Sequence, residues 1–200
     1  MKRHKRFLGL VILLLSLASV TYAQDHDLRF FLGKALSKDG ALSKNERVEL
    51  LSRIEKVLEE AQQVRANLIR GIQSGEMDVR YQEGTFWLSE LEKDGTSIEK
   101  SAQQIKLLKE KPALLVSSIE LYKSLKDLSG NFNAYNNVPS FSAVVGDVAP
   151  EMTLWTDPVF YQLYLLPLAR ARDKEAEPKP PQPQPVPKEK APATKPAKKP

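Results

Sequence analysis

The chain has 200 residues, with 2 histidines, 14 prolines, 9 glycines and no cysteine. This length suits one domain with appendages. The absence of cysteine excludes disulfides, thiolate metal sites, iron–sulfur clusters, cysteine nucleophiles and the acylated cysteine of a bacterial lipoprotein.

The formal net charge of +5 is concentrated at the two ends of the chain. Residues 1–23 carry four basic side chains and no acid, and residues 174–200 carry seven lysines and three glutamates. Residues 24–173 therefore have a net charge of −3. A nucleic-acid-binding face is not expected there, because phosphate contacts need clustered lysine and arginine.

Residues 1–23 contain the three parts of a secretory signal peptide in the required order. A basic stretch, 1–6, precedes an uncharged run, 7–20, and the small residues Thr21 and Ala23 then precede Gln24. The uncharged run is shorter than the roughly 20 residues of a membrane span. We expect cleavage after Ala23 and export to a bacterial periplasm. The alternatives are secretion, or retention at the inner membrane by an uncleaved signal.

Residues 24–42 are expected to form a partly ordered N-terminal segment. Its His26 is the one histidine that follows the signal peptide. We interpret His26 as a solvated residue near a frayed end, with part of an N-terminal metal clip as the alternative.

Residues 43–74 have the pattern of a long amphipathic helix. Ser43 and Glu46 have the spacing of a capping box, and Ser74-Gly75 is a stop signal. Apolar residues recur at steps of three and four, which places them on one broad face. They are Val48, Leu50, Leu51, Ile54, Val57, Leu58, Ala61, Val64, Leu68 and Ile72.

Residues 76–95 are open to three interpretations: a hairpin around Glu83-Gly84, a linker, or part of a kinked helix. We prefer a linker that leads into a helix at Thr85, since helices are predicted on both sides. The next apolar face starts with Phe86, Trp87, Leu88 and Leu91.

Asp94-Gly95 is a turn signal, and Thr96 and Glu99 have the spacing of a second capping box, so a helix is expected to restart there. The apolar phase holds across Gly95, which keeps a kinked continuous helix open. The face continues with Ile98, Ala102, Ile105 and Leu108.

Pro112 is expected to be the first residue of a third helix that closes at Ser129-Gly130. Its apolar face is Leu115, Val116, Ile119, Tyr122, Leu125 and Leu128. Four asparagines follow in a stretch of about 25 residues, which we interpret as a long loop packed along the bundle. They are Asn131, Asn133, Asn136 and Asn137.

Asp157-Pro158 predicts an N-cap followed by a first-turn proline. The apolar run 159–168 is then expected to be a fourth helix, ended or kinked by Pro167 and buried against the first three. A homodimer contact is the alternative. The fold class is therefore all-α: an antiparallel bundle of three to four helices over residues 43–173, with an Asn-rich loop before the last helix.

Residues 174–200 contain nine of the prolines and little apolar surface to bury, so we expect a disordered tail that favours polyproline II. By composition, this stretch alone resembles the periplasm-crossing stretches of TonB-like proteins. It is interpreted either as a solubilising extension or as a tether to anionic wall polymer, lipid headgroups or a proline-binding partner. The candidate contacts are Lys179, Lys188, Lys190, Lys195, Lys198 and Lys199.

Catalytic and cofactor motifs do not occur in the sequence: there is no HExxH, CxxCH, GxGxxG or GxxxxGK[ST] pattern. Two acidic clusters are interpreted as solvated helix faces rather than as a hydrolase pair. They are Glu55, Glu59 and Glu60, with Lys56 beside them, and Glu90, Glu92 and Asp94, with Lys93 beside them.

Four aromatic residues near the last predicted helix are candidates for an interface or ligand pocket, with a core role as the alternative. They are Trp155, Phe160, Tyr161 and Tyr164. We expect a non-enzymatic interaction or scaffold protein of the periplasm, without cofactor, metal or nucleic acid, and with the tail as a tether. The alternative is a ligand-binding or sensory bundle that holds a small apolar molecule near the last helix.

Overall fold

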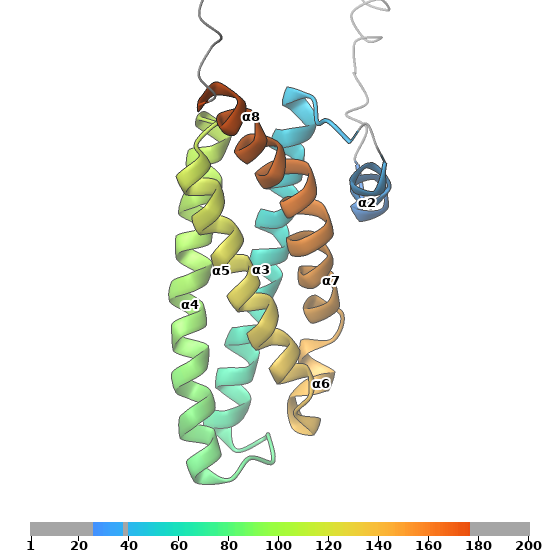
Figure 1. Cartoon of the computed structure of the whole chain (residues 1–200). Helices are drawn as coiled ribbons and strands as arrows, with labels where there is room; N and C mark the ends of the chain where they lie inside the picture. The colour runs from blue at the N-terminus through green and yellow to red at the C-terminus, as the bar shows by residue number, and fades with distance from the viewer. Residues whose placement is uncertain (1–25, 38–39, 177–200) are drawn as a thin grey trace, which may run out of the picture.

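The computed structural model describes residues 26–37 and 40–176, which form helices and no strand, so the all-α prediction is confirmed (Figure 1). The elements are α2 (Leu28–Leu36), α3 (Lys44–Ser74), α4 (Tyr81–Glu110), α5 (Leu115–Asn136), α6 (Pro139–Val145), α7 (Val148–Leu154), the π-helical segment η2 (Trp155–Leu165) and α8 (Leu166–Ala176). The predicted signal peptide, 1–23, and the candidate tail lysines lie outside the described residues.

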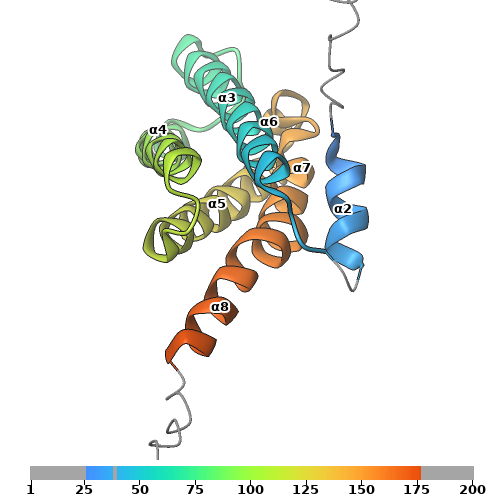
Figure 2. The same ribbon diagram turned by 90° about the horizontal axis from the view of Figure 1, so that it is seen from above.

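Helices α3, α4 and α5 run alternately up and down, and α7, η2 and α8 follow one another along the remaining side (Figure 1). Helix α6 lies at the end of the bundle where α3 connects to α4. Helix α8 lies at the opposite end, where α4 connects to α5. Helix α2 stands beside this body and contacts η2 (Figure 2).

Helix α3 has the bounds that its local signals predict. Ser43 accepts a hydrogen bond from the Glu46 amide, and the Glu46 carboxylate accepts one from the Ser43 amide, which completes the capping box. Gly75 ends the helix with φ of 74°, a left-handed conformation that favours glycine. Of the predicted apolar face, Val48 alone is exposed and Ile72 is half-buried.

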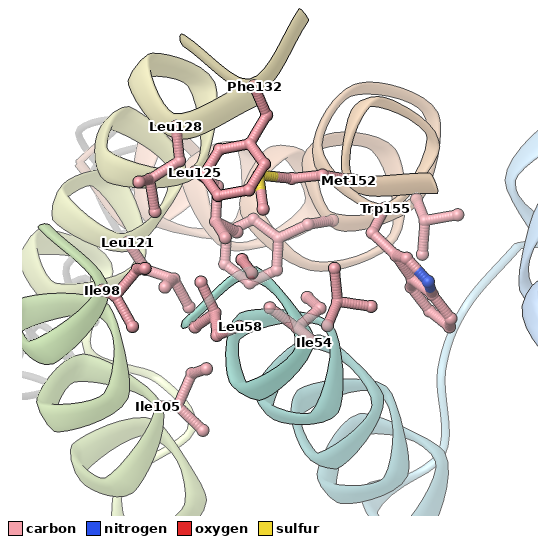
Figure 3. Close-up of a cluster of buried hydrophobic side chains, with 14 of the residues drawn as sticks. Ile54, Leu58, Ile98, Ile105, Leu121, Leu125, Leu128, Phe132, Met152 and Trp155 are labelled. Atoms are coloured by element: carbon pink, nitrogen blue, oxygen red, sulfur yellow. The ribbon is translucent and has the colours of Figure 1, made fainter. Parts of the chain in front are cut away.

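The core forms where the apolar faces of α3, α4 and α5 meet α7 and η2 (Figure 3). Each fully buried aliphatic side chain contributes about 1.5–3 kcal/mol. Without cysteine, packing of this kind holds the fold. The labelled members of the cluster are Ile54, Leu58, Ile98, Ile105, Leu121, Leu125, Leu128, Phe132, Met152 and Trp155.

Helix α4 is continuous across Gly95, which is the alternative that the apolar phase kept open. The predicted turn at Asp94-Gly95 and the predicted start at Thr85 are wrong. The helix begins at Tyr81, which excludes a hairpin around Gly84. Gly95 is a point of close approach: a Cβ there would lie 2.7 Å from the Arg65 guanidinium. Position 95 therefore lies inside a helix, beside the flexible Arg65 side chain of α3, rather than in a turn.

Helix α5 also differs from its prediction at the start and on its face. It begins at Leu115, with Pro112 in the preceding connection. Val116 is 64% exposed and Ile119 49% exposed, whereas Ser117 and Ser118 are buried. The apolar pattern misled because small serines, rather than the larger apolar residues, face the core at this end. The Ser118 hydroxyl donates to the Leu114 carbonyl at 2.9 Å, which satisfies it there.

The predicted Asn-rich loop is helical: α5 continues past Gly130 to Asn136, and α6 and α7 follow. Asparagine favours turns when its side chain bonds to nearby backbone. Here the side-chain amide of Asn131 donates to Asp94 Oδ1 at 2.7 Å. The side-chain amide of Asn133 donates to the backbone carbonyl of Ser129, one helical turn back, at 2.8 Å. These bonds leave the helical backbone intact.

The last predicted helix begins earlier and ends later than the run 159–168, because α7, η2 and α8 are continuous. Pro158 lies inside η2 rather than at a first turn. A proline in a helix clashes with the carbonyl four residues back and donates no bond, and the π-helical widening accommodates it. Pro167 is the second residue of α8 and does not end the helix, which reaches Ala176, inside the segment expected to be disordered.

Candidate binding cleft

A cleft of about 920 Å³ opens at the end of the bundle where α3 connects to α4. Three separate segments line it: the α3–α4 connection, the first turns of α4, and the α5–α6 junction. The lining residues are Asp78, Val79, Gln82, Glu83, Phe86, Trp87, Asn137, Val138, Pro139 and Ser140. We call this the Phe86–Trp87 cleft.

Helix geometry places the α4 residues of the cleft on one face. Gln82 and Phe86, and likewise Glu83 and Trp87, are four residues apart and therefore adjacent on the helix surface. The opposite wall begins where α5 ends, since the Val138 amide donates to the Tyr135 carbonyl and closes the turn into α6. The cleft is thus held between helix ends.

The aromatic pair of the cleft combines a fixed ring with an exposed one. Trp87 is half-buried and meets the rings of Tyr135 and Phe141 edge to face, each at 5.7 Å between centroids. Phe86 packs against Trp87 at 4.9 Å, yet Phe86 is 54% exposed. A large apolar ring anchored by its neighbour and open to solvent is typical of a recognition surface.

The polar groups of the cleft are acidic or neutral. Asp78 and Glu83 contribute carboxylates, and Gln82, Asn137 and Ser140 contribute amides and a hydroxyl. The lining includes no lysine or arginine. The cleft is therefore suited to a ligand that combines an apolar surface with positive charge.

A buried polar cluster lies beneath Trp87. Tyr135 donates its hydroxyl proton to Asp94 Oδ2 at 2.5 Å, and Asp94 is 1% exposed. Burial raises the pKa of the Asp94 carboxyl above its ordinary value, and the bonds from Tyr135 and Asn131 offset part of that rise. Burial, and then the bond to Asp94, raises the pKa of the Tyr135 hydroxyl. Arg65 donates from Nε to the Leu91 carbonyl nearby.

The interpretation of Asp94 as part of a solvated acidic face is therefore wrong. Glu90, Glu92 and Asp94 are close in the sequence and were expected to lie together on a solvated helix face. Asp94 is instead buried, and its carboxylate accepts hydrogen bonds from Asn131 and Tyr135. Glu92 is exposed and Glu90 pairs with Lys93 at 2.6 Å. The other cluster is as expected for Glu59 and Glu60, which are exposed, while Glu55 pairs with Lys109 at 2.5 Å.

The four aromatic candidates near the last helix lie elsewhere, and most are core residues. Phe160 and Tyr164 are stacked at 5.1 Å and are 0% and 2% exposed. Tyr161 is half-buried against Tyr122, at 5.3 Å between ring centroids. Trp155 lines a smaller cleft of about 370 Å³. Half of the apolar run 159–168 is thus buried within the chain itself: Val159, Phe160, Leu163, Tyr164 and Leu165.

His26 is engaged rather than solvated. Its Nδ1 lies 2.6 Å from Glu49 Oε2, its backbone amide donates to Glu49 Oε1, also at 2.6 Å, and its ring packs on Phe30 at 3.8 Å. Among residues 26–37 and 40–176, no group of three or more His, Cys, Asp or Glu side chains is arranged to hold a metal ion.

The cleft was missed in the sequence because its residues come from three distant segments. Phe86 and Trp87 were both assigned to a core-facing helix surface. One signal was nonetheless present: adjacent helical residues point about 100° apart, so of two consecutive large aromatics at least one lies away from the centre of the core-facing surface.

No protein-family model matches the chain, and neither does any curated protein or any solved structure. Within the described part of the chain, the helices are too short or too polar to span a membrane. The function is therefore inferred from the geometry of the Phe86–Trp87 cleft.

Proposed function

We propose that this chain is an exported, non-enzymatic helical interaction protein that binds a partner through the Phe86–Trp87 cleft. The observation that carries this proposal is the exposed Phe86 ring, anchored on Trp87 and flanked by two carboxylates. A partner segment with apolar rings and positive charge fits these groups. The helical bundle serves as a rigid platform that fixes both walls of the cleft.

Export to the periplasm is part of the proposal and is supported by the order of basic, apolar and small residues in 1–23. The basic, proline-rich tail is proposed as a tether to a second surface. Two weak contacts joined by one flexible segment can give avidity that neither contact has alone.

A non-enzymatic role is supported by the chemistry of the side chains. The chain has no cysteine, and His26, the one histidine after residue 23, contacts Glu49 rather than a cleft. The buried carboxylate of Asp94 is bonded to Asn131 and Tyr135 within the core, where it has structural partners.

Site-specific photo-crosslinking in living cells tests the proposal. A photoreactive phenylalanine analogue replaces Phe86 in one strain and Val116, 64% exposed on α5, in a matched control. We expect a discrete adduct with a second polypeptide from position 86 and not from position 116. Identical adducts at both positions, or none at position 86, would reject the cleft as a binding site.

Fractionation of the same cells tests the proposed location. A processed chain recovered with the periplasmic fraction is expected, and an unprocessed chain in the cytosol would contradict export.

A small apolar ligand is the second candidate, now placed in this cleft rather than near the last helix. The volume of about 920 Å³ lies within the ~300–1,000 Å³ of small-molecule sites. Thermal-shift screening of cell extracts tests it: stabilisation that is lost in Phe86→Ser would favour the ligand. The exposure of Phe86 favours a polypeptide, since drug-sized ligands are usually largely enclosed.

A further inference from the structure

We propose that the occupant of the Phe86–Trp87 cleft in the free protein is the chain's own tail, residues 177–200. This inference rests on the proposed function of the cleft, and it adds a regulation: a partner must displace the tail in order to bind. Three independent features support it: the aromatic lining of the cleft suits a proline-rich segment, the charges of cleft and tail are opposite, and the tail is long enough to reach the cleft.

The chemistry of the cleft suits a proline-rich segment. Proline-rich chains form extended polyproline II helices that dock onto aromatic-lined grooves at little entropic cost. Residues 177–200 contain nine prolines. Phe86 and Trp87 supply the aromatic surface.

The charges are complementary. Residues 177–200 contain six lysines and two glutamates, whereas the cleft presents Asp78 and Glu83 and no basic lining side chain. Residues 24–173 as a whole have a net charge of −3, so the tail is drawn to this body rather than repelled by it.

The tail is long enough to reach the cleft from the end of α8. Figure 1 places α8 at one end of the bundle and the start of α4 at the other. Tyr164, two residues before α8, donates to the Pro112 carbonyl in the α4–α5 connection at 3.2 Å. The 30 residues of α4 span about 45 Å. The 24 residues of 177–200 span about 74 Å as polyproline II.

About 15 tail residues would therefore cross the length of the bundle, at ~3.1 Å each. The remaining residues, roughly 192–200, would lie in the cleft. This segment includes Lys195, Lys198 and Lys199, three of the six tail lysines. A tethered segment has an effective concentration in the millimolar range, so even weak docking is well populated.

A spin label on the tail tests the proposal in the full chain. The chain has no cysteine, so Ala193→Cys provides one attachment site. It has two tryptophans, Trp87 in the cleft and Trp155 on η2, whose indole N–H signals in ¹⁵N spectra serve as reporter and internal reference. We expect the label to weaken the Trp87 signal by about half or more, given millimolar effective concentration, and to spare Trp155.

Charge variants and a mixing experiment supply the controls. Asp78→Asn combined with Glu83→Gln is expected to reduce the docked-to-free ratio about fivefold, as for the loss of two exposed ion pairs. Glu92→Gln, on the exposed face of α4, is the matched control and should leave the ratio unchanged. A mixture of ¹⁵N protein without label and labelled protein without ¹⁵N should show no effect, because the docking is within one chain.

Three results would overturn the proposal: an unaffected Trp87 signal, equal weakening of Trp87 and Trp155, or weakening of Trp87 that is equally strong in the mixture, which would mean that the tail docks on a neighbouring copy. If Trp87 is unaffected while crosslinks still form from position 86, the tail proposal fails and the proposed function stands. If both readouts are negative, the cleft is not a binding site.

Discussion

Removing the Tyr135 hydroxyl should destabilise the protein by an amount that depends on pH. Tyr135 is 1% exposed and donates to Asp94 at 2.5 Å. In Tyr135→Phe the ring remains and the donor is lost, so Asp94 retains the Asn131 amide as its hydrogen-bond donor. A hydrogen bond to a charged group contributes about 1.5–3 kcal/mol, and a neutral one about 0.5–1.5 kcal/mol.

The direction of the pH effect follows from the raised pKa of Asp94. Because that pKa is higher in the folded chain than in the unfolded chain, the native state binds this proton more tightly. The contribution of Asp94 to stability therefore falls as pH rises from its ordinary value of 3.8 through the raised value. Tyr135→Phe removes a bond that favours the ionised form, so the folded pKa of Asp94 rises further. The cost of the substitution therefore grows as pH rises from the folded pKa of the parent to the higher folded pKa of the variant.

Urea unfolding monitored by far-UV circular dichroism at about pH 4 and pH 8 measures this difference. At the higher pH we expect the variant to lose about 1.5–3 kcal/mol, or roughly 3–12 °C in Tm for a body of this size. At the lower pH the loss should shrink to about 1 kcal/mol. Comparing variant with parent at each pH removes the contribution of other titrating groups.

Tyr122→Phe is the matched control. Tyr122 donates to Asp157 at 2.8 Å, but the Asp157 side chain is 39% exposed and also pairs with Lys126. That substitution should cost less than about 1 kcal/mol, since water replaces the lost donor. An equal loss for Tyr135→Phe at both pH values, or a loss no larger than that of Tyr122→Phe, would refute the assignment of Asp94 as a buried, titrating carboxyl.

Three further predictions concern helix ends. Gly75→Ala should lower stability by about 1–2 kcal/mol, because φ there is 74°, and Gly75→Asn should cost less; thermal unfolding compares the two. The hydrogen bond from Lys34 lowers the pKa of Glu46 to about 2, so its contribution holds above about 4.5 and is lost as pH falls toward 2; Glu46→Gln should flatten that acid limb in urea titrations. Glu49→Ala removes both bonds to His26, so hydrogen exchange should accelerate in α2 while the middle of α3 stays protected.

The bounds of α3 could be predicted because its signals are local. The capping box at Ser43 and the left-handed glycine at Gly75 act within one turn of the helix. The apolar face between them repeats often enough that one exposed member, Val48, does not change the assignment. Such signals can be read from the sequence because both partners of each interaction lie within a few residues of one another.

The interior of α4 could not be predicted in this way, because its turn-like residues have distant partners. Asp94 is bonded to Asn131 and Tyr135 on α5, and Gly95 faces Arg65 on α3. A side chain that hydrogen-bonds to a distant residue does not form the local hydrogen bond that stabilises a turn, so the helix continues through it. The Asn-rich stretch was misassigned for the same reason, since Asn131 stabilises the contact of two helices rather than a turn.

The cleft combines both kinds of information, and this determines which part of it a sequence can reveal. Consecutive Phe86 and Trp87 place at least one aromatic ring away from the centre of the core-facing surface, but the sequence does not show what lies opposite. The opposite wall begins where α5 ends at Asn136, and the Asn131 side chain bonds this part of α5 to the buried Asp94 on α4. Because Tyr135 contacts both Trp87 and Asp94, the polar cluster that holds α4 against α5 also supports the aromatic floor of the cleft.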